Sequence, residues 1–195
     1  MKSKIHEYQK NNNKLMSKSK LLSLLAVISM GSFAQTKMIT KTGKLTFEAS
    51  VPAFEEVKAK NESVTVVLNP GTGEIASLAL VKGFRFKTAL MEEHFNENYM
   101  ESDTYPKSTF KGKIENFDVS KLTATAQAYT IKGKMEMHGK SKDIVINANI
   151  KKTADGIDLD SNFTVNTDDY GIDIPSVVSK KVSKKVSVKL DATLK

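Results

Sequence analysis

The residues of this chain that could do chemistry are few and far apart in the sequence. His94 and His138 are the histidines outside the N-terminal region, and the chain has no cysteine. A metal site would have to combine both histidines with a carboxylate such as Glu93, without any of the short ligand spacings of known metal motifs. Glu92-Glu93 and Asp168-Asp169 pair carboxylates as a general acid and base would, but a helix start and a turn explain them more simply. No serine stands with a histidine and an acid at hydrolase spacing. We therefore expect no enzyme, no metal ion and no cofactor.

The N-terminal region has the three parts of a secretory signal peptide. Lys14, Lys18 and Lys20 precede an apolar run over residues 21–30, and Gly31-Ser32-Phe33-Ala34 then supplies small residues for a peptidase. The run is short for a permanent transmembrane helix, which is the alternative interpretation. We expect residues 1–34 to be a signal peptide cleaved near Ala34 and the mature protein to be periplasmic or secreted. Met16 is an alternative start.

The basic charge of the chain is concentrated in the same region. The formal net charge is +8, from 30 basic and 22 acidic residues, and residues 1–34 hold six of the basic residues and one of the acidic ones. The remainder carries a net charge of only +3. A nucleic-acid partner is therefore not expected, because phosphate binding needs a concentrated basic surface.

From residue 35 onward the apolar residues recur mostly at every second position, which is typical of half-buried strands. Turn signals such as residues 69–73, 139–142 and 154–156 separate about eight such runs. Among these runs, residues 75–87 read as one strand with a bend at Gly83. This spacing predicts an all-β domain over residues 35–195, a barrel or a sandwich of antiparallel strands. The charged outer faces of the strands argue against an outer-membrane barrel.

Two segments interrupt this pattern with helical character. Residues 90–110 are rich in aromatic residues and methionine, and Met91 and Phe95 are spaced as on one face of a helix that Thr88 would cap. Tyr105-Pro106 ends any helix there. Pro175 predicts the first turn of a second short helix.

Three sequence blocks resemble the YceI-like family. The first runs from Met91-Glu92-Glu93-His94-Phe95 through Ser102-Asp103-Thr104-Tyr105-Pro106-Lys107-Ser108-Thr109-Phe110 and is similar to that family's H-L/F, S-x-x-F/Y and Y-P-x-x-x-F signature. The second is residues 131–142, similar to G-x-L-x-I-H-G-x-T-K, and the third is Asp169-Tyr170-Gly171-Ile172, similar to D-F-G-I. The blocks stand in family order and the resemblance covers residues 36–195. An early histidine and an arginine before the third block, usual in the family, are absent.

The resemblance implies an antiparallel lipocalin-like β-barrel with one or two short helices, which binds an isoprenoid or another long apolar chain in its lumen. The departures suggest a compact branch whose lumen is shorter or filled by its own side chains. The alternative is a structural or interaction domain with a filled core and no lipid. The candidate lumen residues are Phe47, Phe84, Phe86, Leu90, Met91, Phe95, Tyr99, Phe110, Met135, Met137, Phe163 and Tyr170.

The remaining expectations concern the histidines and the partners. We expect His94 to make a structural hydrogen bond, with a position at the ligand end of the lumen as the alternative. We expect His138, beside Gly139, to hold a turn or the barrel rim. The expected partner is a lipid or isoprenoid molecule, and a transient membrane contact stays open. The sequence does not indicate the oligomeric state.

Overall fold

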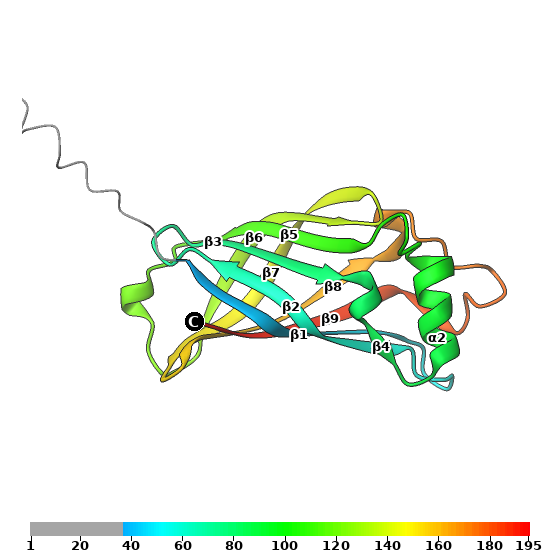
Figure 1. Ribbon diagram of the computed structural model, residues 1–195, viewed down its shortest axis with the longest axis horizontal. Helices are drawn as coiled ribbons and strands as arrows, with labels where there is room; N and C mark the ends of the chain where they lie inside the picture. Colours follow the sequence, from blue (N-terminus) through cyan, green and yellow to red (C-terminus); the bar gives the residue numbers. More distant parts are fainter. Residues whose placement is uncertain (1–36) are drawn as a thin grey trace, which may run out of the picture. The chain divides into compact units, whose positions relative to one another are not determined.

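A computed structural model describes residues 37–195, so the signal peptide and its cleavage near Ala34 lie outside the described residues. The described chain folds into an antiparallel β-barrel (Figure 1). Its strands are β1 (Met38–Ser50), β2 (Lys58–Leu68), β3 (Glu74–Leu80), β5 (Lys107–Ile114), β6 (Gln127–Met137), β7 (Lys140–Thr153), β8 (Gly156–Asn166) and β9 (Val182–Leu194).

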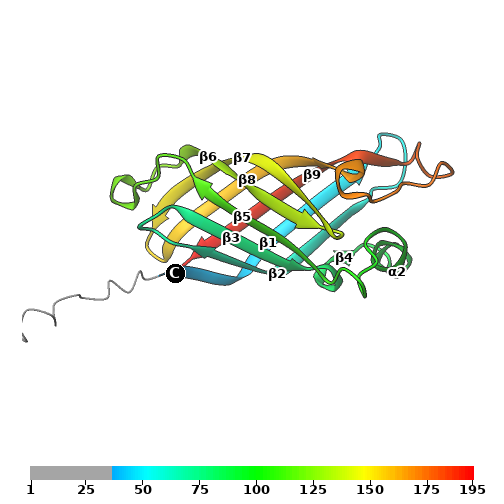
Figure 2. The same ribbon diagram turned by 90° about the horizontal axis from the view of Figure 1, so that it is seen from above.

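The barrel is closed by hydrogen bonding between its first two strands. The strand order is β1-β9-β8-β7-β6-β5-β3-β2, and β1 pairs with β2 from Met38 opposite Leu68 to Glu48 opposite Lys58. A two-residue strand, β4 (Arg85–Phe86), adds to β2 at Ala59 and Lys60. The predicted all-β, antiparallel barrel of about eight strands is confirmed, and the sandwich is excluded by this closure (Figure 2).

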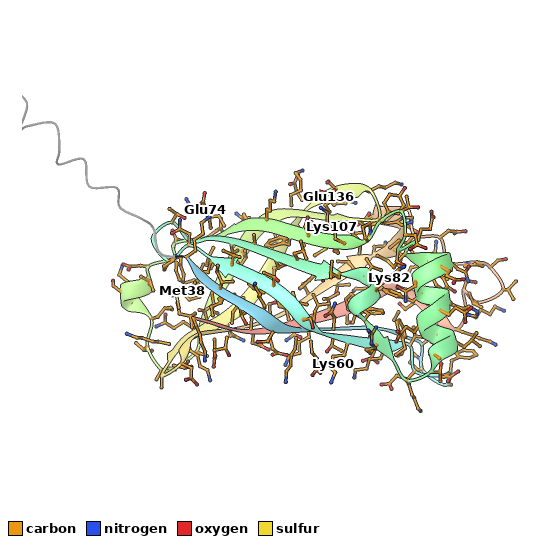
Figure 3. All side chains as sticks on the ribbon, in the orientation of Figure 1. Met38, Lys60, Glu74, Lys82, Lys107 and Glu136 are labelled. Atoms are coloured by element: carbon orange, nitrogen blue, oxygen red, sulfur yellow. The ribbon has the colours of Figure 1, made fainter. Side chains whose placement is uncertain are left out.

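The alternating sequence pattern gives the barrel its two faces. Ile157, Leu159 and Ser161 of β8 are buried, whereas the residues between them are only half-buried. Labelled charged side chains such as Lys60, Lys107 and Glu136 point away from the barrel wall (Figure 3). This arrangement follows from the twofold periodicity of a strand, which sends every second side chain into the lumen.

The two ends of the barrel differ in what covers them. At one end lie the turn between β2 and β3, the turn between β7 and β8, and a 3-10 helix, η4 (Val119–Lys121). At the other end lie α2 (Ala89–His94), a π-helical turn η3 (Phe95–Tyr99), a 3-10 helix η5 (Thr167–Tyr170) and the loops 51–57 and 171–181 (Figure 1). We call the second end the helical end.

The segment formed by α2 and η3, which we call the helical crossing, begins as predicted. The hydroxyl of Thr88 accepts a hydrogen bond from the Met91 amide, which confirms the cap. Helical structure continues through η3 to Tyr99, several residues before Pro106. No helix in residues 37–195 has the length and apolar character needed to cross a membrane.

Three local predictions were wrong. The strand predicted over residues 75–87 is broken by a 3-10 helix, η2 (Val81–Gly83), where the Asn61 side chain donates a hydrogen bond to the Leu80 carbonyl. Residues 176–181 form successive turns instead of a helix. The turn placed at residues 139–142 is centred on His138 and Gly139, which both have positive φ.

Candidate ligand-binding cavity

An apolar cavity of about 330 Å³ occupies the lumen at the helical end. Its wall comes from β1, β3, β4, β5, β6, β8 and β9, and its cover comes from α2, η3 and the loops that join the strands there. Inward-facing valines of β9, Val186 and Val188, line one side, and Met91 and Phe95 line the side under the crossing. The twofold pattern of the strands and the helical pattern of the crossing therefore place apolar side chains around one space.

Four phenylalanine rings join the crossing to the barrel wall. Phe47 of β1 lies 5.3 Å from Phe84, 5.7 Å from Phe86 and 5.3 Å from Phe95, between ring centroids. Phe95 also meets Phe84 at 5.6 Å and Phe86 at 5.0 Å. Edge and stacked geometries at these distances are favourable for aromatic pairs. The cluster gives the cavity a wall made almost wholly of hydrocarbon.

The structure brings most of the predicted lumen residues together. Nine of the twelve line the cavity: Phe47, Phe84, Phe86, Met91, Phe95, Tyr99, Met135, Met137 and Phe163. Phe110 lines a separate, deeper void. Leu90 is 59% exposed on α2, and Tyr170 is 1% exposed in the core; neither lines the cavity.

The sequence-based selection omitted several lining residues. Ile172 and Ile174 line the cavity from the segment after η5, and Val178 lines it from the loop that follows. Their only sequence signal is the alternation of Ile172 and Ile174 about Asp173, in a stretch too short to be recognised as a strand. Leu45, on the inner face of β1, could have been found from the same alternation that identified Phe47.

Two kinds of polar side chain line the cavity, ionisable groups and hydroxyl groups. Glu55, His94 and Lys181 line it from loops and from α2. Ser108 donates a hydrogen bond to the Glu136 carbonyl, and the buried Thr167 hydroxyl has no hydrogen-bond partner among the described residues. The structural hydrogen bond expected for His94 is absent from the described part of the chain; the side chain lies at the cavity instead. No group of three potential metal ligands occurs within residues 37–195.

His138 holds the rim, as predicted. Its Nδ1 lies 3.1 Å from the Tyr170 carbonyl oxygen, and its Nε2 lies 3.3 Å from Oε1 of Glu101. Its ring also packs edge-on against Tyr105, with centroids 4.6 Å apart. These contacts join the β6–β7 turn to η5 and to the segment after η3, which both contribute residues to the cavity.

The family of the chain follows from a comparison of its sequence with family models. The model of the YceI-like domain matches residues 26–194. The chain belongs to the YceI-like family. No curated protein sequence matches it.

Solved structures of YceI-like and related proteins share the fold. A polyisoprenoid binding domain from Saccharophagus degradans, implicated in plant cell wall breakdown, has a TM-score of 0.72 at 14% identity, over 82% of this chain and 97% of that one. BcnA of Burkholderia cenocepacia gives 0.63 at 16% identity, over 78% and 94%. The YceI protein of Campylobacter jejuni gives 0.56 at 18% identity, over 74% and 89%.

The three YceI-like sequence blocks meet at the helical end of this barrel. The first forms the crossing over the cavity and enters β5, the second supplies Met135 and the His138 turn, and the third forms η5 and Ile172. A salt bridge between Lys142 and Asp169 further links the second block to the third. The blocks therefore build the covered end of the lumen, not the opposite end.

Proposed function

We propose that this protein binds one long apolar chain, an isoprenoid or another lipid, in the cavity at the helical end of its barrel. The observation that carries the proposal is the apolar cavity of about 330 Å³ inside a closed barrel. Burial of hydrocarbon gains roughly 25 cal/mol per Å² removed from water, so such a space favours a lipid tail over a polar substrate. The polyisoprenoid named for the Saccharophagus domain is a ligand of this class.

The polar groups of the cavity suggest the orientation of the ligand. Glu55, His94 and Lys181 come from α2 and the loops of the helical end, whereas Met135 and Phe163 lie deeper on the strands. A lipid tail would therefore point into the barrel, and its polar head would remain near these three side chains. No reaction is required of them, and we propose a binding protein without catalytic activity.

The alternative, a structural domain with a filled core, is less well supported. It requires apolar side chains to meet across the lumen at both ends of the barrel. The end opposite the crossing satisfies this requirement, since Leu68, Ile150 and Leu194 are fully buried. The helical end does not, because the cavity lies between its walls.

We further propose that the protein is exported and that the helical end contacts a membrane when lipid enters or leaves. Export is supported by the predicted signal peptide at residues 1–34. Membrane contact is supported by the loop 171–181, in which Val177 is 87% exposed and Lys180 and Lys181 lie nearby. An exposed apolar residue beside lysines suits the surface of an anionic bilayer.

Lipid binding is tested by extraction and titration. The mature chain, purified from a bacterial host, is extracted with organic solvent for mass spectrometry, and the delipidated protein is titrated with prenyl alcohols and fatty acids. We expect a bound lipid and saturable binding. Ala49→Phe, which places a ring in the cavity, should weaken binding, whereas Val145→Phe on the exposed face of β7 should not. A lipid-free protein that binds neither class of chain would refute the proposed function.

A further inference from the structure

The lumen of the barrel is hollow at the helical end and solid at the other. Below the main cavity of about 330 Å³ lies a second void of about 50 Å³. Beyond the second void, the inward side chains of the remaining half close the lumen. Leu68, Ile114, Ile150 and Leu194 are at most 1% exposed and line neither space.

A small set of residues separates the two spaces. Five residues line both: Leu45, Ala79, Ser108, Met135 and Phe163. Phe110 lines only the deeper void and stands opposite Met135 in the β5–β6 pairing and opposite Ser77 in the β3–β5 pairing. Phe110 is therefore the first large side chain on β5 below the main cavity.

The ring of Phe110 lies over two glycines of the barrel wall. Gly112 and Gly133 face each other across β5 and β6. A Cβ on Gly112 would stand 2.7 Å from the Phe110 ring, and one on Gly133 would stand 2.6 Å from it. The two glycines leave a hollow in the wall, and the ring fills that hollow. Removal of the ring would open space that no neighbouring side chain occupies.

We propose that Phe110, with Met135 above it, forms the floor of the lumen and limits the ligand to a short chain; this rests on the proposed function. A water-sized group occupies roughly 30 Å³, so the main cavity holds on the order of ten such groups. A methylene group is of similar size. A chain of geranyl to farnesyl length, or a fatty acid of comparable length, therefore fills the cavity, and the far part of a longer polyisoprenoid stays outside the barrel.

This arrangement predicts how affinity depends on chain length. Each methylene buried in the cavity strengthens binding about fourfold, because it is removed from water. Once the chain reaches the floor, further carbons remain at the mouth and add little. Affinity therefore rises up to the farnesyl length and then levels off.

The test is a chain-length series with variants of the floor. Wild type, Phe110→Ala and the milder Phe110→Leu are titrated with geraniol, farnesol, geranylgeraniol and solanesol, and with saturated fatty acids of matching lengths. Wild type should bind farnesol more tightly than geraniol, and geranylgeraniol and solanesol no more tightly than farnesol. Both variants should favour geranylgeraniol over farnesol about tenfold more than wild type does. Phe117→Leu is the matched control, since Phe117 packs on Tyr129 and lines neither space.

The outcomes separate this inference from the proposed function. A folded Phe110→Leu protein with the length preference of wild type would overturn the role of Phe110. Wild-type affinity that keeps rising through solanesol would overturn the length limit while leaving lipid binding intact. Failure of wild type to bind any alcohol or acid of either series would instead refute the proposed function itself.

Discussion

Phe47 and Phe95 stack with their ring centroids 5.3 Å apart and an interplanar angle of 27°, although they are almost fifty residues apart in the sequence. Phe47 belongs to β1 in the barrel wall, and Phe95 is the first residue of η3. The stack is the central contact of a four-ring cluster that also contains Phe84 and Phe86. The helical crossing is therefore held on the barrel by aromatic packing.

Replacement of Phe95 by alanine tests this attachment. Phe95→Ala should lower the free energy of unfolding by about 3 kcal/mol, at the low end for a large-to-small change because the ring is only half-buried. Urea denaturation measures the change. Phe54→Ala is the control, since Phe54 is 47% exposed in the loop 51–57 and its loss should cost less than about 0.5 kcal/mol. Equal stabilities of wild type and Phe95→Ala would contradict the packing described.

A second prediction concerns the turn at the cavity rim. His138→Ala removes two side-chain hydrogen bonds and the edge contact with Tyr105, and it places alanine at a φ of 50°. The expected cost is about 2 kcal/mol, with faster amide exchange in residues 99–105. His138→Asn keeps a residue that tolerates positive φ but lacks the ring. If the asparagine variant matched wild type in stability and exchange, the ring contacts would have no role in the rim.

The barrel was predictable because each strand buries one face, so that apolar and polar residues alternate along its sequence. The break in the strand after β3 was not, because it depends on Asn61 of another strand. The amide of Asn61 reaches the Leu80 carbonyl and lies against Gly83, where a Cβ would meet it at 2.5 Å. A local pattern contains no information about such a partner.

The cavity lining was likewise predictable only where a local sequence pattern determines it. Met135 and Phe163 could be placed in the lumen from alternation alone, because their strands have one inner face. The crossing was harder, since a short helix with apolar residues on several sides does not indicate which side meets the barrel. Leu90 accordingly faces solvent while Met91 faces the cavity. The sequence could not distinguish the hollow half of the lumen from the solid half, because apolar residues line both.

A third prediction concerns alkaline stability. Burial, with a contribution from the charge of Asp169, raises the pKa of the Tyr170 phenol above its ordinary value of 10.0. The unfolded chain therefore loses this proton at lower pH than the folded one, and the resulting stability is present below pH 10 and lost as the pH rises above it. Tyr170→Phe should be at least as stable as wild type near neutral pH, because the hydroxyl has no partner among the described residues.

The measurement is the urea midpoint of wild type and Tyr170→Phe at pH about 8 and about 11. Tyr170→Phe should lose less stability than wild type when the pH is raised from the lower to the higher value. Tyr129→Phe is the control, since its hydroxyl is hydrogen-bonded to Gln127, and it should follow the wild-type profile. Identical alkaline losses in wild type and Tyr170→Phe would contradict the prediction.

A fourth prediction concerns two carboxylates on the outer face of the barrel. Asp160 and Asp191 oppose each other across β8 and β9, and Nζ of Lys189 lies 3.2 Å from one and 2.9 Å from the other. Hydrogen bonds to Asp191 and then Asp160 raise the pKa of Lys189, so its charged form stabilises the fold and this contribution is lost only at strongly alkaline pH. Lys189→Gln leaves two like charges face to face.

Lys189→Gln should lower stability near neutral pH by about 0.5–1 kcal/mol, because these groups are partly exposed. The deficit should shrink with added salt and at strongly acidic pH, because hydrogen bonds to Asp191 and then Lys189 lower the pKa of Asp160 in the wild type, and this stabilisation is lost once Asp160 is protonated. Lys113→Gln, on the exposed outer face of β5, is the matched control. The double change of Lys189→Gln with Asp191→Asn should recover most of the loss. A deficit in Lys189→Gln that is independent of salt and pH would argue against charge repulsion as its cause.

The last prediction concerns the loop 171–181 and the membrane contact proposed for it. Val177 is 87% exposed, and Lys180 and Lys181 follow it in a loop that also lines the cavity. Insertion of an apolar side chain together with attraction of lysines to anionic headgroups would hold this end at a bilayer, each lysine contributing about 1 kcal/mol. Val177→Asp should therefore weaken flotation with phosphatidylglycerol vesicles and slow lipid transfer between vesicles. Val145→Asp, an exposed valine on β7, should leave both unchanged. Equal flotation and transfer of Val177→Asp and wild type would show that this loop is not the membrane contact, whatever the cavity binds.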